Sequence, residues 1–220
     1  EFPGQTEVWT DGDNYSRGHW LNGRVSSQPL ASVVTEICHR SGVETVNTDA
    51  VYGLVRGYQQ ADIATARSSL QPLMLAFGFD AFERDGLLAF QSRDARVVAE
   101  VGDDDLIDLP DLDGSLEATR SSDVETAGQV RLNYVDAQSS YEVRSVEARF
   151  PDDDSLNVSQ SDLPLALTRT EGQAAVERWL AEARVARDTV RFGLPKSRLS
   201  LGAGDVVSLA GRRYRVDRVE

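Results

Sequence analysis

The feature that most constrains this sequence is an acidic stretch near the middle of the chain. Residues 100–125 hold ten carboxylates against a single base, Arg120, and carry a charge of −9 out of a net −13 for the 220 residues. Because unpaired charges are costly to bury, such a stretch is unsuited to a hydrophobic core. We therefore expect it to be solvated or to face a cavity, and to separate two domains, residues 1–105 and 129–220, as an acidic linker or loop at residues 106–128.

The first domain is expected to contain two amphipathic helices. Apolar residues from Leu30 to Cys38 follow the spacing of one helical face, which predicts a helix over residues 29–42. A second apolar stripe, from Ile63 to Phe77, predicts another helix. The residues expected to begin, kink or end these helices are Ser26 or Ser27, Gly42, Asp62 and Pro72.

A β-hairpin is the clearest short-range prediction in the sequence. Residues 79–83 and 87–90 are rich in apolar and aromatic side chains, and they flank Asp85-Gly86, a pair that tolerates the positive φ of a tight turn. Together with the helices, the hairpin predicts a small α/β domain. Further strands of this domain are expected at residues 51–58 and 96–101.

The second half has the pattern of many strands and one helix. Apolar residues from Ala175 to Ala183 form a stripe that predicts a helix over residues 171–187. Short strands with a single packed helix are typical of a small antiparallel β-barrel, so the chain as a whole is expected to be α+β. The expected strands are residues 129–135, 141–150, 163–167, 189–194, 205–209 and 214–220.

Both ends of the sequence suggest a piece of a longer polypeptide. The chain has no initiator Met, and its only methionine is Met74. The last residues, from Tyr214 to Glu220, alternate apolar and polar like a strand. We therefore expect a segment of a larger protein, with a processed or truncated chain as the alternative.

The composition disfavours several kinds of chemistry. Cys38 is the only cysteine, so no internal disulfide forms, and the two histidines, His19 and His39, lie far apart in sequence. This disfavours most zinc sites and most catalysis that depends on histidine. The net charge of −13 disfavours stable binding to nucleic acid phosphates. It is compatible with a surface past which DNA slides without adhering.

Three acidic clusters are weak candidates for metal sites. Asp11-Gly12-Asp13-Asn14 begins like a calcium loop, but the twelfth position holds Asn22 instead of Glu. A polar turn is the favoured interpretation there. The runs at residues 103–105 and 152–154 are expected to be solvated loops, with calcium binding as the minority interpretation.

No catalytic constellation stands out in the sequence. Cys38 lies on an apolar stripe next to His39, which favours a buried, inert thiol over a nucleophile. Gly202–Asp205 precedes a strand, not a helix, so it is interpreted as a turn rather than a phosphate cradle. A pair of carboxylates suited to glycoside cleavage stays open, since many acids are present. The tryptophans that are candidates for stacking on sugars, for the core or for an interface are Trp9, Trp20 and Trp179.

Several groups of residues together resemble one family. They are residues 18–24 with the helix at 29–42; residues 55–58 with the next helix and residues 79–90; residues 134–141 with residues 163–168 and their helix; and residues 201–207 leading to 214–216. The combination resembles the hub, or baseplate hub, of phage tails. It is most similar to the large hub ("megatron") proteins of alphaproteobacterial gene transfer agents, which are DNA-packaging particles of phage origin.

The resemblance implies a structural role without catalysis. Such hubs are trimers whose barrel domains form a pseudo-sixfold ring that continues the tail tube, although this chain contains one expected barrel where the hubs use two. The implied partners are two further copies, tail tube and distal tail proteins, and tip or spike proteins, with contact to the bacterial cell envelope as a further expectation. DNA is expected to pass through without specific binding. No catalytic, metal or cofactor residue is carried over.

The implied location is the tail tip or baseplate of a virion or gene transfer agent particle made in the bacterial cytoplasm. We also expect the acidic residues 100–125, or other carboxylates, to face the DNA channel. The alternative function is a carbohydrate-active or peptidoglycan-cleaving module of a tail tip, and a receptor-binding domain is a third. An enzyme would hold two carboxyl groups about 5–5.5 Å or about 6.5–9.5 Å apart in a cleft.

Overall fold

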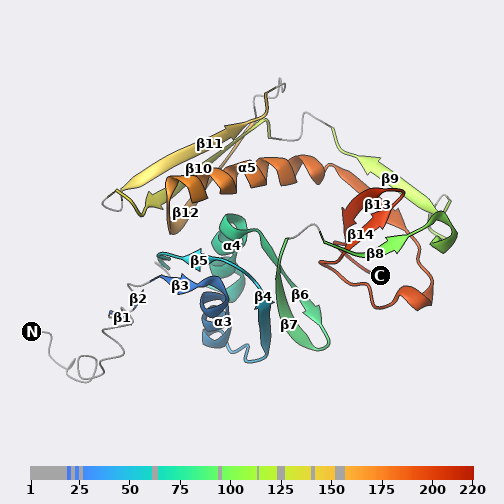
Figure 1. Cartoon of the computed structure of the whole chain (residues 1–220), viewed down its shortest axis with the longest axis horizontal. Coiled ribbons are helices and arrows are strands. Elements are labelled where there is room, and N and C mark those ends of the chain that lie inside the picture. Colours follow the sequence, from blue (N-terminus) through green and yellow to red (C-terminus); the bar gives the residue numbers. More distant parts are fainter. Residues whose placement is uncertain are drawn as a thin grey trace, which may run out of the picture.

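The computed structural model describes most of the chain after its first residues (Figure 1). The described residues are 19–20, 23–24, 27–60, 64–93, 96–112, 114–122, 127–139, 142–151 and 157–220. The elements are β1 His19–Trp20, β2 Gly23–Arg24, β3 Gln28–Pro29, α3 Leu30–Arg40, β4 Val46–Ala50, β5 Leu54–Val55, α4 Ala66–Phe77, β6 Phe79–Arg84, β7 Leu87–Ser92, β8 Val97–Val101, η1 Asp103–Asp105, β9 Leu116–Arg120, β10 Gln129–Asp136, β11 Val143–Arg149, β12 Val158–Leu167, α5 Arg169–Val185, β13 Asp188–Phe192, η3 Lys196–Arg198, β14 Val206–Leu209 and β15 Arg212–Arg215.

Helix α3 forms as the apolar spacing predicts. Leu30, Val34 and Cys38 recur every four residues and are buried on its inner face. The expectation that Ser26 or Ser27 caps the helix is wrong, because Pro29 occupies the cap position and makes no side-chain hydrogen bond. The N–H of Leu30 instead donates to the carbonyl of Gly53, 2.9 Å away, so a distant loop satisfies a group that a side-chain cap would otherwise serve.

Helix α4 begins later than the sequence pattern suggests. Thr65 is its N-cap and accepts a hydrogen bond from the N–H of Ser68, whereas Asp62, the expected cap, lies outside the described residues. The helix continues through Pro72 and ends at Gly78, whose φ of 66° is the left-handed conformation that glycine adopts at low cost.

The predicted hairpin is present as β6 and β7. The strands pair antiparallel up to Arg84↔Leu87, and both Asp85 and Gly86 have positive φ, as the tightest hairpin turns require. Strand β4 was not predicted and pairs parallel with β7. The strand expected at residues 51–58 is reduced to the two residues of β5.

A three-stranded sheet covered by α5 dominates the second half. Strand β10 lies between β11, which runs antiparallel to it, and β12, which runs parallel. Every second residue of β10, including Val130, Leu132 and Tyr134, is buried. Contacts of α5 with β10 and β11 show that this buried face packs against the helix, and Figure 1 shows the helix lying along the sheet.

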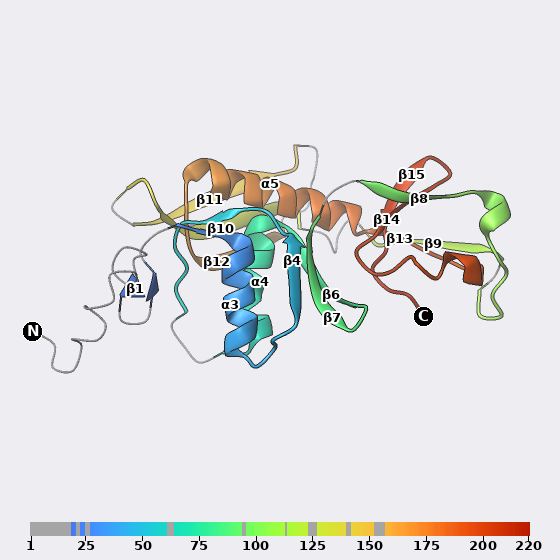
Figure 2. The ribbon, with the colours of Figure 1, turned by 60° about the horizontal axis from the view of Figure 1, so that its bottom comes forward.

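Two hydrophobic cores lie at opposite ends of the molecule (Figure 2). The larger one is formed by α3, α4, α5 and the sheets of β4–β7 and β10–β12, which we call the large lobe. The smaller one surrounds Val101, Val207 and Leu209 and is formed by residues of β8, β13, β14 and β15 and of the adjoining loops. These strands, together with the exposed strand β9 that pairs with β13 and with η1 and η3, make up what we call the small lobe. Each lobe therefore combines segments that precede the acidic stretch with segments that follow it. The division of the chain into domains at residues 1–105 and 129–220, with a linker at residues 106–128, stays a prediction.

The α+β class is confirmed, but the strands differ from the expected antiparallel barrel. In the described part of the chain, strands form sheets of two or three, and none of these closes into a barrel. Parallel pairs join β10 to β12, β8 to β14 and β4 to β7. Alternation along each strand was visible in the sequence, whereas the order of the strands depends on contacts between segments far apart in it. Among the described helices, none has the length and apolar character needed to cross a membrane.

Candidate functional site

One regular surface of the large lobe is the side of the β10–β12 sheet that faces away from α5. Because successive side chains of a strand point to opposite faces of the sheet, this surface carries the residues that alternate with the buried ones along each strand. We call it the outer sheet face. Its residues are Gln129, Arg131, Asn133, Val135, Val143, Ser145, Glu147, Arg149, Val158, Gln160 and Asp162.

Charges on the outer sheet face compensate one another across the strands. Glu147 accepts hydrogen bonds from Gln129 Nε2 at 2.9 Å and Arg131 Nη2 at 3.0 Å, and Asn133 Nδ2 donates to Asp162 at 2.5 Å. The face holds two arginines and two carboxylates, so it is polar with no net charge. Both carboxylates already have partners on β10, and they lie on opposite sides of that strand. This arrangement suits a solvated wall better than an acid–base pair.

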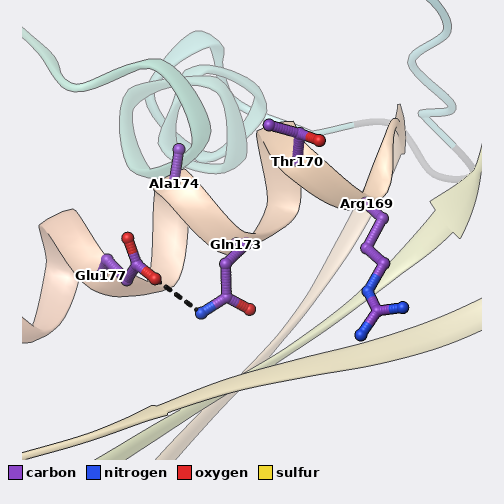
Figure 3. Close-up of a pocket in the computed structure, with 5 residues that line it drawn as sticks. All are labelled: Arg169, Thr170, Gln173, Ala174 and Glu177. Carbon is purple, nitrogen blue, oxygen red and sulfur yellow. Dashed lines mark hydrogen bonds between the residues drawn. The ribbon is translucent and has the colours of Figure 1, made fainter.

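A shallow hollow of about 320 Å³ lies on the exposed side of α5 (Figure 3). One helix supplies all the residues that line it: Arg169, Thr170, Gln173, Ala174 and Glu177. Gln173 Nε2 donates to Glu177 Oε1 at 2.8 Å, and the Arg169 side chain extends from the preceding turn of the helix (Figure 3). With a single carboxylate that is already engaged, the hollow lacks the second acid that glycoside cleavage needs.

Cys38 and His39 occupy different environments. The Cys38 side chain is completely buried in the large core, and burial raises the pKa of its thiol. A buried thiol with a raised pKa is a poor nucleophile. His39 is exposed and its Nε2 lies 3.2 Å from the carbonyl oxygen of Glu44, so it contributes to the end of α3.

The remaining candidate residues from the sequence lie in different environments, and some lie outside the described part of the chain. Trp179 packs against the large core. Asp105, from the run at residues 103–105, accepts hydrogen bonds from the N–H of Gly102 and from Arg198 Nη2, each at 3.0 Å. Those two contacts, the backbone N–H first, lower the pKa of Asp105. No group of three metal-ligating side chains occurs in the part of the chain that is described. Trp9, residues 11–14 and residues 152–154 lie outside it, as does the side chain of Trp20.

The acidic stretch is paired with a basic segment that the sequence analysis did not single out. Asp105 pairs with Arg198 at 3.0 Å, and Asp111 pairs with Arg191. Residues 116–120 form β9 and pair antiparallel with β13, with Arg120 and Asp188 opposite each other. The signal that could have revealed this pairing is the excess of arginines after residue 183. Much of the stretch is therefore part of the small lobe.

The two lobes meet along one face of β6, where charged and apolar side chains alternate. Asp80, Phe82 and Arg84 are its half-buried residues. Arg215 Nη1 lies 3.3 Å from Asp80, and Arg84 Nη2 lies 2.9 Å from Asp205, whose side chain is only 9% exposed. We call these two ion pairs, together with the close approach of Gly204 to the ring of Phe82, the junction.

Glycine is required at the centre of the junction. Gly204 has a φ of +89°, and a Cβ built on it would lie 2.8 Å from a ring carbon of Phe82. That approach is shorter than van der Waals contact, so even alanine would displace the ring. The Arg84 guanidinium also lies over the Phe82 ring, 5.0 Å from its centroid. The predicted turn at Gly202–Asp205 is thus the element that lets the small lobe approach β6.

Three arginines hold helix α5 against the rest of the large lobe. Arg56 donates to Glu171 in a pair of 3.1 Å, Arg93 bridges Asp80 and Glu182, and Arg178 donates to the carbonyl of Ala76 at 2.5 Å. Since Ala76 lies in the last turn of α4, Arg178 serves a carbonyl that has no partner within its helix. Burial lowers the pKa of Arg178, whereas the hydrogen bond to Asp80 raises the pKa of Arg93.

Glu171 has two roles at the start of α5. Its carboxylate completes a capping box with Thr168 and accepts the hydrogen bonds of Arg56. Burial alone would raise the pKa of Glu171, but the hydrogen bonds from Arg56 and Thr168 outweigh burial and lower it. The ionised form is therefore the one that the folded chain stabilises.

Comparison with solved structures finds a similar protein at high sequence identity. A chain of the virion of a native gene transfer agent particle is 53% identical, superposes with a TM-score of 0.84, and is matched over 96% of this chain. The match covers 49% of that protein, so this chain spans about half its length. No match is found among curated protein sequences.

Two more distant structures share the fold. The tail protein from Neisseria meningitidis MC58 is 13% identical with a TM-score of 0.58, over 88% of this chain and 61% of that one. The 43 kDa tail protein of prophage MuSo2 from Shewanella oneidensis is 11% identical with a TM-score of 0.54, over 84% and 56% of the two chains. A family model of phage tail proteins, Phage-tail_3, matches residues 65–219, which include α4, the outer sheet face and the junction. The chain therefore belongs to this family of phage tail proteins.

Proposed function

We propose that the chain is a structural, non-catalytic component of a tail hub that links a tail tube to the tail tip. The observation that carries the proposal is the 53% identity to a protein of a gene transfer agent virion along 96% of the chain. Membership of the phage tail family supports it. The proposed location is the tail tip or baseplate of such a particle. The proposed neighbours are tail tube and distal tail proteins on one side and tip or spike proteins on the other.

The outer sheet face is the surface that best suits a passage for DNA. A wall with clustered arginines or lysines would bind phosphates and slow the moving duplex. Here Arg131 is paired with Glu147, and the face as a whole has no net charge. Carboxylates of residues 100–125 are a second candidate for the wall, but Asp105 and Asp111 are already engaged by arginines.

A photo-crosslinking experiment tests the proposed passage. A photoreactive amino acid at Ser145, on the outer sheet face, should crosslink to DNA when particles that contain the chain are triggered to release it. The matched control carries the same amino acid at Ala174, which is exposed on the outer side of α5, and should give no crosslink. Equal crosslinking at both positions, or none at Ser145, would contradict the proposal.

Assembly and catalysis are tested separately. Native mass spectrometry of the purified chain is expected to show trimers, because the proposed hub is a closed ring of three copies. Purified peptidoglycan incubated with the chain should release no soluble fragments. If Glu147→Gln or Asp162→Asn abolished a measured release of fragments, the hub would be the wrong function and the cell-wall enzyme the right one.

A further inference from the structure

The contact between the two lobes is mostly ionic. In the part of the chain that is described, the large and small hydrophobic cores share no buried residue. Two ion pairs cross between β6 and the small lobe, Asp80–Arg215 and Arg84–Asp205. The apolar contribution identified at this contact is the Phe82 ring against Gly204. A contact of this kind buries little apolar surface, so it holds two lobes together less firmly than a continuous core does.

The charges at the junction are arranged in a complementary order. Along β6 the sequence of side chains is acidic, aromatic, basic, at Asp80, Phe82 and Arg84. The small lobe presents Arg215, Gly204 and Asp205 to them. Sliding the small lobe along β6 would place like charges opposite each other, so the order selects one position of the lobe. Arg215 and Asp80 are 40% and 28% exposed, whereas Asp205 is only 9% exposed, so dissolved ions screen the Asp80–Arg215 pair more strongly than the Arg84–Asp205 pair.

The lobes are also connected at a place away from the junction, where the chain passes from α5 in the large lobe to β13 in the small lobe. Helix α5 ends at Val185 and β13 begins at Asp188, so only Ala186 and Arg187 separate them. The N–H of Ser121, which follows β9, donates to the carbonyl of Arg187 at 3.0 Å. Two segments that cross between the lobes are therefore tied together here, and the tie does not depend on the junction.

We propose that the junction is a salt-sensitive latch between the two lobes. When it is closed, the ion pairs along β6 fix the small lobe in the position described above. When it is open, the small lobe pivots about the tied crossing at Ser121 and Arg187, while both hydrophobic cores stay folded. This conformational freedom goes beyond the proposed role in a tail hub and does not depend on it.

Distance measurements between spin labels test the latch. Labels at Ser145→Cys, in the large lobe, and Leu199→Cys, in the small lobe, sit on exposed positions, and native Cys38 is completely buried and so unreactive. At low salt the distribution of distances between the two labels should be narrow. It should broaden as salt rises from about 0.1 M to about 1 M, where the screening length falls from about 10 Å to about 3 Å.

A double variant separates the latch from general effects of charge. Arg84→Gln with Arg215→Gln removes both crossing pairs while leaving Asp80 paired with Arg93. This variant should show the broad distribution already at low salt. The matched control, Arg131→Gln with Arg144→Gln, removes two arginines of similar exposure from the sheet and should behave like the unchanged chain.

Hydrogen exchange of the β10 amides accompanies each distance measurement. If the latch opens as proposed, these amides stay as protected in the junction variant as in the unchanged chain. The proposal is overturned if the junction variant keeps the narrow distribution at low salt. It is equally overturned if protection of β10 is lost together with the junction, because the lobes would then unfold as one unit.

Discussion

The two lobes of this molecule are stabilised in different ways. The large lobe buries side chains from three helices and two sheets in one core that includes Phe79, Leu132 and Val176. Among the described residues, the small lobe has three buried core residues, and it has several ion pairs, including Asp105–Arg198 and Asp111–Arg191. Exposed ion pairs contribute little net stability, whereas buried apolar area contributes in proportion to its extent. We therefore expect the large lobe to determine folding and the small lobe to respond to solution conditions.

The largest expected effect is a cavity in the large core. Leu132 is completely buried in β10, so Leu132→Ala should lower the free energy of unfolding by about 2–5 kcal/mol. Chemical denaturation followed by tryptophan fluorescence measures this change. Leu209→Ala, in the small core, should mainly increase exchange of β14 amides while those of β10 keep their protection. Equal loss of protection in both strands would remove the distinction between the lobes.

The next effect comes from the glycine at the junction. Gly204→Ala should cost about 1–2 kcal/mol from positive φ alone, with a further cost because Phe82 must move. Gly211→Ala is the control, because Gly211 also has a positive φ of 75° but no atom lies within 4 Å of the position that its Cβ would occupy. Thermal unfolding of both variants should show the larger loss at Gly204. Adding Phe82→Leu should recover part of that loss, and an equal loss at both glycines would argue against the close contact.

A smaller and pH-dependent effect is expected at Glu171. Removing its carboxylate in Glu171→Gln should cost about 1 kcal/mol at neutral pH, since the capping box and the Arg56 pair are weakened. The pKa of Glu171 is lowered by folding, so its contribution is present above the unfolded value of about 4.3 and is lost as pH falls through the folded pKa. The stability difference between the variant and the unchanged chain should therefore shrink in acid.

The control for Glu171 is Glu177→Gln on the exposed side of the same helix. Denaturation curves at several pH values measure both variants. A difference for Glu171→Gln that stays constant down to about pH 3, below the ordinary pKa of a glutamate, would show that the carboxylate is not held in its ionised form.

The smallest expected effect is on the outer sheet face. Arg131→Gln breaks an ion pair whose two side chains are about half exposed, so stability should change by less than about 0.5 kcal/mol. Denaturation measures that change, and a loss above about 1 kcal/mol would mean that the face is structural rather than a solvated wall. Glu147→Lys places a second positive charge opposite Arg131, so it should lower stability slightly and increase retention of the chain on immobilised DNA.

The elements that local pattern determines were predictable from the sequence. The apolar spacing of Leu30, Val34 and Cys38 predicts α3, and Asp85-Gly86 predicts the β6–β7 turn with its positive φ values. The four-residue spacing and the turn chemistry act within a few residues, so no distant segment is needed to specify them.

Features that depend on distant segments were not predictable in the same way. Strand β4 and the parallel pairing of β10 with β12 require partners far along the chain. The acidic stretch was expected to be a linker because its partners, Arg191 and Arg198, lie about eighty residues or more away. The junction was partly visible, since the turn at Gly202–Asp205 was identified, but nothing in the sequence showed that Phe82 lies against it.

An electron-microscopy map of an intact particle that contains the chain tests the central claim most directly. The account predicts that the outer sheet face, with Arg131, Ser145 and Glu147, borders the central passage in a threefold arrangement, and that α5 lies on the side away from it. A map in which that face packs against another protein, or in which a lining rich in arginine and lysine surrounds the passage, would contradict the account.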